Sequence, residues 1–131
     1  MLRIAVAALA ALVLAAPAGA APFFRTPSGN IYCAYFAPQL RCDIKSGVKP
    51  LPPKPASCEF DWGAGFKLGA TGRAYVSCVS DSVYDPHAKV LAYGSTWRNG
   101  KLSCASQLAG LRCRNGAAHG FFMSRAHSYA F

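Results

Sequence analysis

The chain has 131 residues, with 14 lysines and arginines against five aspartates and glutamates, which gives a formal net charge of +9. That length suits one domain, and the excess of positive charge favours anionic partners over cationic ones. The six cysteines include no C-x-x-C spacing, which argues against a zinc knuckle, a thioredoxin-like redox site and covalent haem attachment.

Residues 1–21 have the pattern of a secretory signal peptide. Arg3 precedes an apolar run that continues to Ala16, and the small residues at 18–20 match an A-x-A cleavage site. The apolar run is about 13 residues long, whereas a membrane-spanning helix needs about 20. We therefore expect a signal peptide over residues 1–21 and one exported domain over residues 22–131, in the periplasm or outside the cell, with no transmembrane segment after processing.

Residues 100–113 repeat residues 29–42 without a gap. Six of the fourteen aligned positions are identical, namely Gly29/Gly100, Cys33/Cys104, Ala34/Ala105, Leu40/Leu111, Arg41/Arg112 and Cys42/Cys113. Each copy predicts two short strands joined by a turn and tied by its own pair of cysteines. An even number of cysteines in a short exported chain also indicates a disulfide framework. By the repeat and then by elimination, the expected disulfides are Cys33–Cys42, Cys104–Cys113 and Cys58–Cys78.

In chain order, strand patterns alternate with turns that contain glycine, proline or asparagine. The expected strands are residues 30–36, 40–45, 57–68 with a hairpin at 63–65, 73–80, 89–97 with a break at 94, 101–105, 111–114 and 120–125. Asn99-Gly100 predicts the two-residue type I′ turn of a hairpin. The pairing of the cysteines places Ile31 opposite Ile44, as an apolar cross-strand pair.

The proline-rich residues 46–56 predict a stiff, extended crossover between two parts of one sheet system. No apolar period of 3.6 residues occurs after the signal pattern, which argues against helices. The expected fold class is therefore all-β, as a small disulfide-stapled barrel or a two-sheet sandwich with two similar hairpins.

Two segments carry a resemblance to a known family: FRTPSGNIYC at residues 24–33 and LAGLRCRNGAAHGFFMSR at residues 108–125. They resemble the two ends of a small exported bacterial domain family of unknown function. Its pattern is F-x-x-P-S-G-N-I-x-C near the start and G-L-x-C-x-N-x-x-G-H-G-F-x-x-S-R near the end. The chain departs from this pattern at Ala118, where the family has glycine. The resemblance implies export and a compact domain, and it implies no particular activity.

The candidates for catalysis lie in residues 115–125, where polar side chains gather among aromatic ones. His119 as a general base and Ser124 as a nucleophile would make a small secreted hydrolase. Their spacing places them on opposite faces of a continuous strand, unless the chain bends at Gly120, and no G-x-S-x-G motif occurs. We therefore lean towards a protein without catalytic activity, in which His119 takes part in the hydrogen bonds of a glycine-rich turn.

No set of side chains has the spacing of a metal or cofactor site. Asp85 and His87 flank a proline that favours a loop. His119 and His127 are eight residues apart, with no carboxylate between them. We expect no metal and no cofactor.

Basic residues give the broadest functional signal. Arg41, Lys45, Lys49 and Lys54 lie in or after the first hairpin of the repeat, and Arg98, Lys101, Arg112 and Arg114 lie in the second. The candidate binding residues are Arg112 and Arg114 on one strand face, Lys101 across the hairpin, and Arg125.

A surface of this kind attracts anionic partners, such as lipid headgroups, wall polymers, acidic polysaccharide or extracellular DNA. Tyr32, Tyr35 and Phe36 are placed near it to stack on sugars or bases. No element that reads base edges is present, so we expect no sequence-specific nucleic-acid binding.

The leading hypothesis is a non-enzymatic binding or structural module at the cell envelope or outside, whose partner is an anionic envelope component or another protein. One alternative is a small secreted hydrolase that uses His119. A second is a secreted inhibitor or toxin-like protein, which would act through the hairpin tip at Ala37-Pro38-Gln39 or the tip at Leu108-Ala109. A third alternative is that the lysines and arginines are scattered over the surface and serve only to keep the domain soluble.

Overall fold

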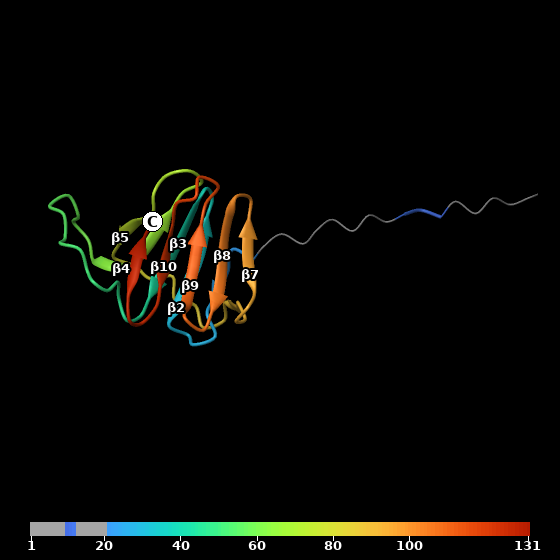
Figure 1. The fold of residues 1–131 in the computed structure, drawn as a ribbon, viewed down its shortest axis with the longest axis horizontal. Helices are drawn as coiled ribbons and strands as arrows, with labels where there is room; N and C mark the ends of the chain where they lie inside the picture. The colour runs from blue at the N-terminus through green and yellow to red at the C-terminus, as the bar shows by residue number, and fades with distance from the viewer. Residues whose placement is uncertain (1–9, 13–20) are drawn as a thin grey trace, which may run out of the picture.

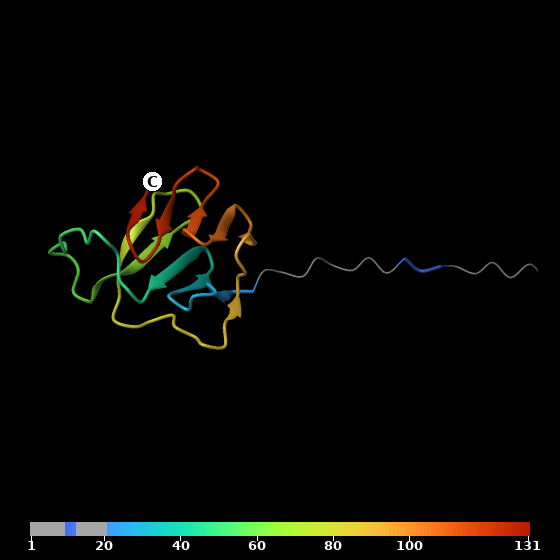
Figure 2. The same ribbon diagram turned by 60° about the horizontal axis from the view of Figure 1, so that its bottom comes forward.

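The structure is a computed structural model that describes residues 10–12 and 21–131. Most of the expected signal peptide therefore lies outside the described residues. Eleven strands, and no helix, are found in the described part of the chain, and they form two stacked sheets (Figures 1 and 2). The choice left open by the sequence is thereby decided in favour of a two-sheet sandwich over a closed barrel.

The first sheet has six strands in the order β5-β4-β3-β2-β1-β6. They are β1 (Phe23–Arg25), β2 (Ile31–Phe36), β3 (Gln39–Ile44), β4 (Trp62–Leu68), β5 (Tyr75–Cys78) and β6 (Lys89–Val90). The second sheet has five strands in the order β11-β10-β9-β8-β7. They are β7 (Thr96–Asn99), β8 (Leu102–Gln107), β9 (Gly110–Arg114), β10 (Gly120–Met123) and β11 (Ser128–Ala130).

The internal repeat extends over four strands of each sheet, well beyond its fourteen aligned residues. Across β1 to β4, one row of cross-strand neighbours is Phe24, Cys33, Cys42 and Phe66. Across β7 to β10, the equivalent row is Trp97, Cys104, Cys113 and Phe121. The two rows face each other, because Phe24 meets Trp97 with ring centroids 5.1 Å apart and Phe66 stacks on Phe121 at 5.3 Å.

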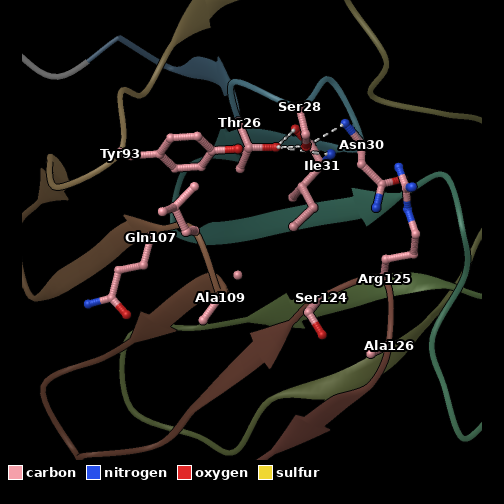
Figure 3. A pocket seen from close by; sticks show the side chains of 12 residues that line it. Thr26, Ser28, Asn30, Ile31, Tyr93, Gln107, Ala109, Ser124, Arg125 and Ala126 are labelled. Atoms are coloured by element: carbon pink, nitrogen blue, oxygen red, sulfur yellow. Dashed lines mark hydrogen bonds between the residues drawn. The ribbon is translucent and has the colours of Figure 1, made fainter.

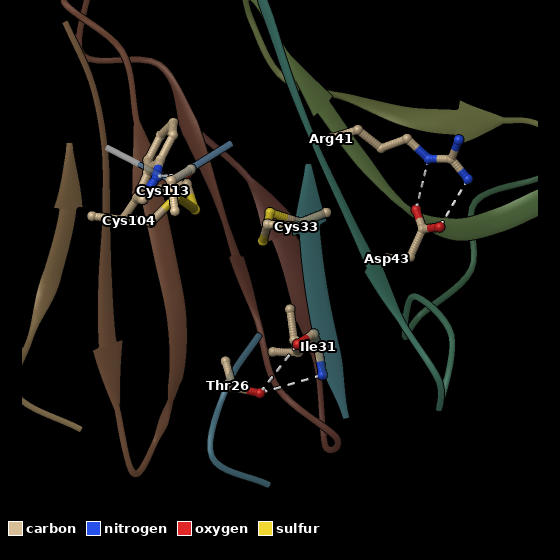
Figure 4. The surroundings of a disulfide bond; sticks show 10 residues. Thr26, Ile31, Cys33, Arg41, Asp43, Cys104 and Cys113 are labelled. Atoms are coloured by element: carbon tan, nitrogen blue, oxygen red, sulfur yellow. Dashed lines mark hydrogen bonds and ion pairs between the residues drawn. A yellow bond between two sulfur atoms is a disulfide. The ribbon is translucent and has the colours of Figure 1, made fainter. Parts of the chain in front are cut away.

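Two disulfides lie in contact at the centre of this core. The structure contains the three pairs that the repeat predicts, Cys33–Cys42, Cys58–Cys78 and Cys104–Cys113. The sulfur atoms of Cys42, Cys104 and Cys113 all lie within 4.8 Å of one another, so the two hairpin disulfides pack against each other between the sheets (Figure 4). The expected pairing of Ile31 with Ile44 on β2 and β3 is also present.

The hairpin expected at residues 63–65 is wrong. These residues lie inside the single strand β4, whose pairing with β5 is irregular between Trp62 and Phe66. Gly65 stands opposite Asp43 of β3, and a β-carbon on it would overlap the carbonyl oxygen of Cys42. Glycine here therefore permits close approach of two backbones and does not mark a turn.

The strand expected at residues 89–97 is wrong as well, because the chain crosses between the sheets at this point. Lys89–Val90 pairs with β1 in the first sheet, whereas Thr96–Asn99 pairs with β8 in the second. The hairpin turn that follows is one residue later than expected. Asn99 still pairs with Leu102, and Gly100, with φ +55°, and Lys101 form the turn.

Residues 79–88, which we call the strap, lie across the outer face of the first sheet. Arg41 of β3 donates from Nη1 to Asp81 Oδ1 at 2.8 Å and from Nη2 to the Asp81 carbonyl oxygen at 2.8 Å. The backbone amide of Val83 donates to Asp43 Oδ2 at 3.2 Å. Tyr84 packs edge-on against Tyr32, with ring centroids 5.2 Å apart. The strap therefore buries the outward side chains of β3.

Arg41 and Asp43 form a buried bidentate ion pair under the strap (Figure 4). Nε of Arg41 donates to Oδ1 of Asp43 at 3.0 Å, and Nη2 donates to Oδ2 at 2.8 Å. Burial alone would lower the pKa of Arg41, but its hydrogen bonds to Asp43 and Asp81 raise this pKa above its ordinary value. Arg41 is thus a structural residue, and its expected place in a positive binding surface is wrong.

Substitution of Gly65 or Gly120 by alanine will destabilise the fold. Gly120 stands opposite Arg114 as Gly65 stands opposite Asp43, and a β-carbon on Gly120 would overlap the carbonyl oxygen of Cys113. We expect G65A and G120A each to lower the free energy of unfolding by about 1–3 kcal/mol or more, measured by urea denaturation. The matched control is G72A in an exposed turn, where an added β-carbon has no neighbour within 4 Å. Equal stability of G120A and G72A would contradict this account of the sheets.

Loss of Asp43 will cost far more stability than loss of Asp81. D43A leaves the Arg41 guanidinium buried without its bidentate partner, and we expect it to lower the free energy of unfolding by about 3–5 kcal/mol. D81N will have a much smaller effect, because the Asp81 side chain is 77% exposed. Similar losses from the two substitutions would show that the buried pair does not hold the strap.

The contribution of Asp81 will depend on pH. The hydrogen bond and charge of Arg41 lower the pKa of the Asp81 carboxyl group in the folded protein. Its stabilising effect is therefore complete above the unfolded pKa of about 3.9 and is lost as the pH falls through the lower folded value. The difference in unfolding midpoint between the wild type and D81N should shrink over that acid range, and a difference that stays constant would exclude this linkage.

Candidate functional site

The outer face of the second sheet carries an open set of basic side chains. In β9, Leu111 and Cys113 point into the core while Arg112 and Arg114 point out and are exposed. Arg114 stands opposite Ser103 of β8, which in turn stands opposite Arg98 of β7. The strap covers the first sheet and not this one, and Arg98, Arg112 and Arg114 are exposed to solvent.

Arg98, Arg114 and the nearby Lys101 line one hollow at the end of the sheet where β8 begins. This basic hollow has a volume of about 390 Å³. It is lined by Arg98, Gly100, Lys101, Leu102, Ser103, Arg114, Asn115, Gly116 and Ala118. No acidic residue lines it, and its three cations have no ion-pair partner among the described residues. The structure thus brings together two expected binding residues, Lys101 and Arg114, and adds Arg98.

The segregation of charge along the chain makes the basic hollow strongly positive. All five acidic residues lie between residues 43 and 85. Residues 86–131 contain six lysines and arginines and no aspartate or glutamate. None of these five acidic residues lines the hollow, so its field is reduced mainly by salt and solvent.

Asn115 fixes the turn that forms one wall of the basic hollow. Its Nδ2 donates to the carbonyl oxygens of Gly69 at 3.0 Å and Gly72 at 2.8 Å, which ties the turn to the β4–β5 connection. Its Oδ1 accepts from the backbone amides of Ala117 at 3.0 Å and His119 at 3.1 Å. Ala118 adopts φ +62°, a left-handed conformation that glycine tolerates better than alanine.

The other expected binding residues lie outside the basic hollow. The Arg112 guanidinium lies over the Phe131 ring at 4.0 Å, beside an aromatic stack of Phe122, His127 and Tyr129. That stack had no clear signal in the sequence, because its members come from β10, β11 and the turn between them. Arg125 lies at the opposite end of β10 from the hollow, in the turn before β11.

Arg125 lines a second hollow, which we call the end groove (Figure 3). This groove has a volume of about 450 Å³ and is formed where three turns meet, at residues 26–30, 107–110 and 124–126, together with Tyr93. The basic hollow and the end groove share no residue. They lie at opposite ends of β8, since Leu102 lines the first and Gln107 the second.

The structure separates the two catalytic candidates. His119 precedes β10 and Ser124 follows it, which places them about 17 Å apart along an extended strand. Ser124 Oγ donates to the carbonyl oxygen of His127 at 2.8 Å and accepts from the amide of His127 at 3.1 Å. His119 joins its turn through its backbone amide and carbonyl, both bonded to Asn115. Among the described residues, neither side chain has the partner that nucleophilic catalysis requires.

The residues that could bind a metal have structural roles instead. Asp85 Oδ1 accepts from the backbone amide of His87 at 2.9 Å, as part of a loop turn. Within residues 10–12 and 21–131, the one close group of three possible ligand atoms is formed by sulfurs of Cys42, Cys104 and Cys113. All three sulfurs are in disulfides and so do not act as thiolate ligands.

The expected stacking surface of Tyr32, Tyr35 and Phe36 does not form. Tyr32 is buried beneath Tyr84, and Tyr35 packs against the core next to Trp97. Phe36 alone is well exposed. The two hairpin tips suggested for an inhibitor are exposed at Ala37-Pro38 and at Leu108-Ala109, and the Leu108 side chain is 86% exposed.

Comparison with known proteins supplies a family and no activity. Among the residues that the structure describes, none lies in a helix with the length and apolar character needed to cross a membrane. The three disulfides are typical of an oxidising compartment. No curated protein and no solved structure matches the chain. The model of a family of unknown function (DUF6636) matches residues 4–131, so the protein belongs to that family.

Proposed function

We propose that the protein is an exported, non-enzymatic binding module that holds an anionic polymer at its basic hollow. The observation that carries the proposal is the convergence of Arg98, Lys101 and Arg114 on one hollow without an acidic neighbour. Arg98 and Arg114 flank Ser103 on neighbouring strands, a spacing of about 10 Å that is comparable to the Debye length at 0.1 M salt. The cations can therefore act together on a chain of carboxylate, sulfate or phosphate groups.

Solubility alone does not account for this arrangement. A charge that serves only solubility is interspersed with charges of the opposite sign over the surface. Here the acidic residues are confined to residues 43–85, and Arg41, which the strap buries, is neutralised by Asp43 and Asp81. Arg98, Lys101 and Arg114, by contrast, have no ion-pair partner among the described residues and gather at one end of the second sheet.

The proposal places the protein in the periplasm or outside the cell and assigns it no catalytic step. Export is supported by the signal pattern of residues 1–21 and by three disulfides in a domain of about 110 residues. No catalytic role is proposed, because His119 and Ser124 lie at opposite ends of β10 and the Ser124 hydroxyl forms hydrogen bonds with the backbone.

Charge reversal in the basic hollow will abolish binding to polyanions. The wild type should be retained on heparin and carboxymethyl matrices and elute as salt rises, because each contact is an exposed ionic one. We expect K101E/R114E to lose most of this retention, measured by the salt concentration at elution.

The control is K54E/K89E, which changes the net charge by the same amount at exposed lysines that do not line the hollow. If the two double variants elute at the same salt concentration, binding reflects net charge alone and the hollow is not the site. Absent or salt-insensitive retention of the wild type would remove the basis of the proposal.

A further inference from the structure

The end groove is a second, independent hollow whose chemistry differs from that of the basic hollow. Its volume of about 450 Å³ lies within the range of roughly 300–1,000 Å³ that is usual for ligand sites. Gln107 in the end groove and Leu102 in the basic hollow are separated along β8 by about 17 Å. A ligand in one hollow therefore does not reach the other unless it is a long polymer.

One side of the end groove offers a free cation with hydrogen-bonding neighbours. The Arg125 side chain is exposed and has no hydrogen-bond or ion-pair partner among the described residues, and Figure 3 shows it beside Asn30. No acidic residue lines the groove. The Gln107 amide, likewise without a partner in the described part of the chain, lies on the other side. A guanidinium of this kind suits a carboxylate, which it can bind through two parallel hydrogen bonds.

Apart from Gln107, the opposite side of the end groove is apolar. Leu108 is 86% exposed at the tip of the β8–β9 hairpin, and Tyr93 is 44% exposed on the loop that enters β7. Ala109 continues this wall, and Figure 3 shows Tyr93 and Arg125 at opposite ends of the groove. A ligand that fits both sides has a carboxylate at one end and an apolar side chain a short distance away.

The turns that form the end groove are held by their own hydrogen bonds. Thr26 is buried, and its Oγ1 accepts from the backbone amide of Ile31 at 3.3 Å. Ser124 Oγ closes the β10–β11 turn through two bonds to the backbone of His127. At Gly110 a β-carbon would overlap the carbonyl oxygen of Met123, so the backbone at the β8–β9 tip lies in close contact with β10. Fixed turns reduce the entropy lost when a ligand binds.

We propose that the end groove binds the C-terminal end of a peptide. Arg125 receives the terminal carboxylate, and Leu108 and Tyr93 pack against an apolar side chain near that terminus. An apolar wall favours such a peptide over an acidic sugar, whose surface is covered with hydroxyl groups. Capture of a C-terminal carboxylate is a recurring mode of peptide recognition.

The test uses the full processed protein and a short probe, the acetylated tripeptide alanine–leucine–alanine with a free carboxylate. Binding is followed by NMR titration at constant ionic strength, with the amidated tripeptide and glucuronate as comparison ligands. We expect the free peptide to shift the amide signals of residues 107–110 and 124–126. Amidation of the peptide should weaken binding by about tenfold or more, because it removes the charged acceptor.

Two variants separate the two sides of the groove. R125Q should weaken the free peptide about tenfold and leave the affinity for the amidated peptide unchanged, whereas L108S should weaken both peptides by the same factor. Both positions are exposed, so the folded state is retained, and the thermal unfolding midpoint of each variant verifies this. K101E/R114E is the matched control, and it should bind the tripeptide like the wild type.

Several outcomes would overturn the inference. They are absence of binding, equal affinity for the free and amidated peptides, binding that R125Q does not change, and glucuronate binding as tight as that of the tripeptide. The polyanion experiment fails or succeeds independently of these outcomes. R125Q should remain on the heparin matrix, and K101E/R114E should leave peptide binding intact, so the failure of one site is distinguishable from the failure of the other.

Discussion

The contact between two disulfides at the centre of the sandwich is the constraint on which the remaining structure depends. Each disulfide locks a hairpin, and the sulfurs of Cys42, Cys104 and Cys113 lie within 4.8 Å of one another between the sheets. A small domain exposes much of its surface and gains limited burial, so staples inside the core add stability that apolar packing alone would not supply. The aromatic pairs Phe24–Trp97 and Phe66–Phe121 then extend this centre outwards to both sides.

Much of the fold follows from the repeat, because a cysteine pair on adjacent strands fixes strand register as well as connectivity. Once Cys33 faces Cys42, the pairing of Ile31 with Ile44 and the alternation of buried and exposed residues are determined. The strand at Gly65 was not predictable in this way, because a glycine that allows two backbones to approach has the same local pattern as one in a turn. Its equivalence to Gly120 emerges only from the registers with Asp43 and Arg114.

The candidate site was predictable where charge and strand alternation suffice, and it was missed where distant segments meet. Arg114 and Lys101 lie on one hairpin, so their convergence follows from its sequence. Arg41 looked like a similar surface cation, and only the strap, from residues forty positions later, reveals that it is buried. The end groove draws on turns near residues 28, 108 and 125, and no local pattern relates these three segments.

The two copies of the repeat show how one sequence difference separates a structural face from a binding face. Arg41 and Arg112 occupy equivalent positions on β3 and β9, and each points away from the core. Two residues later along the same strand face, the first copy has Asp43 and the second has Arg114. An aspartate there pairs with the arginine, neutralises it and allows the strap to bury both. An arginine instead repels its neighbour, which disfavours burial of either side chain and keeps the face open and positively charged.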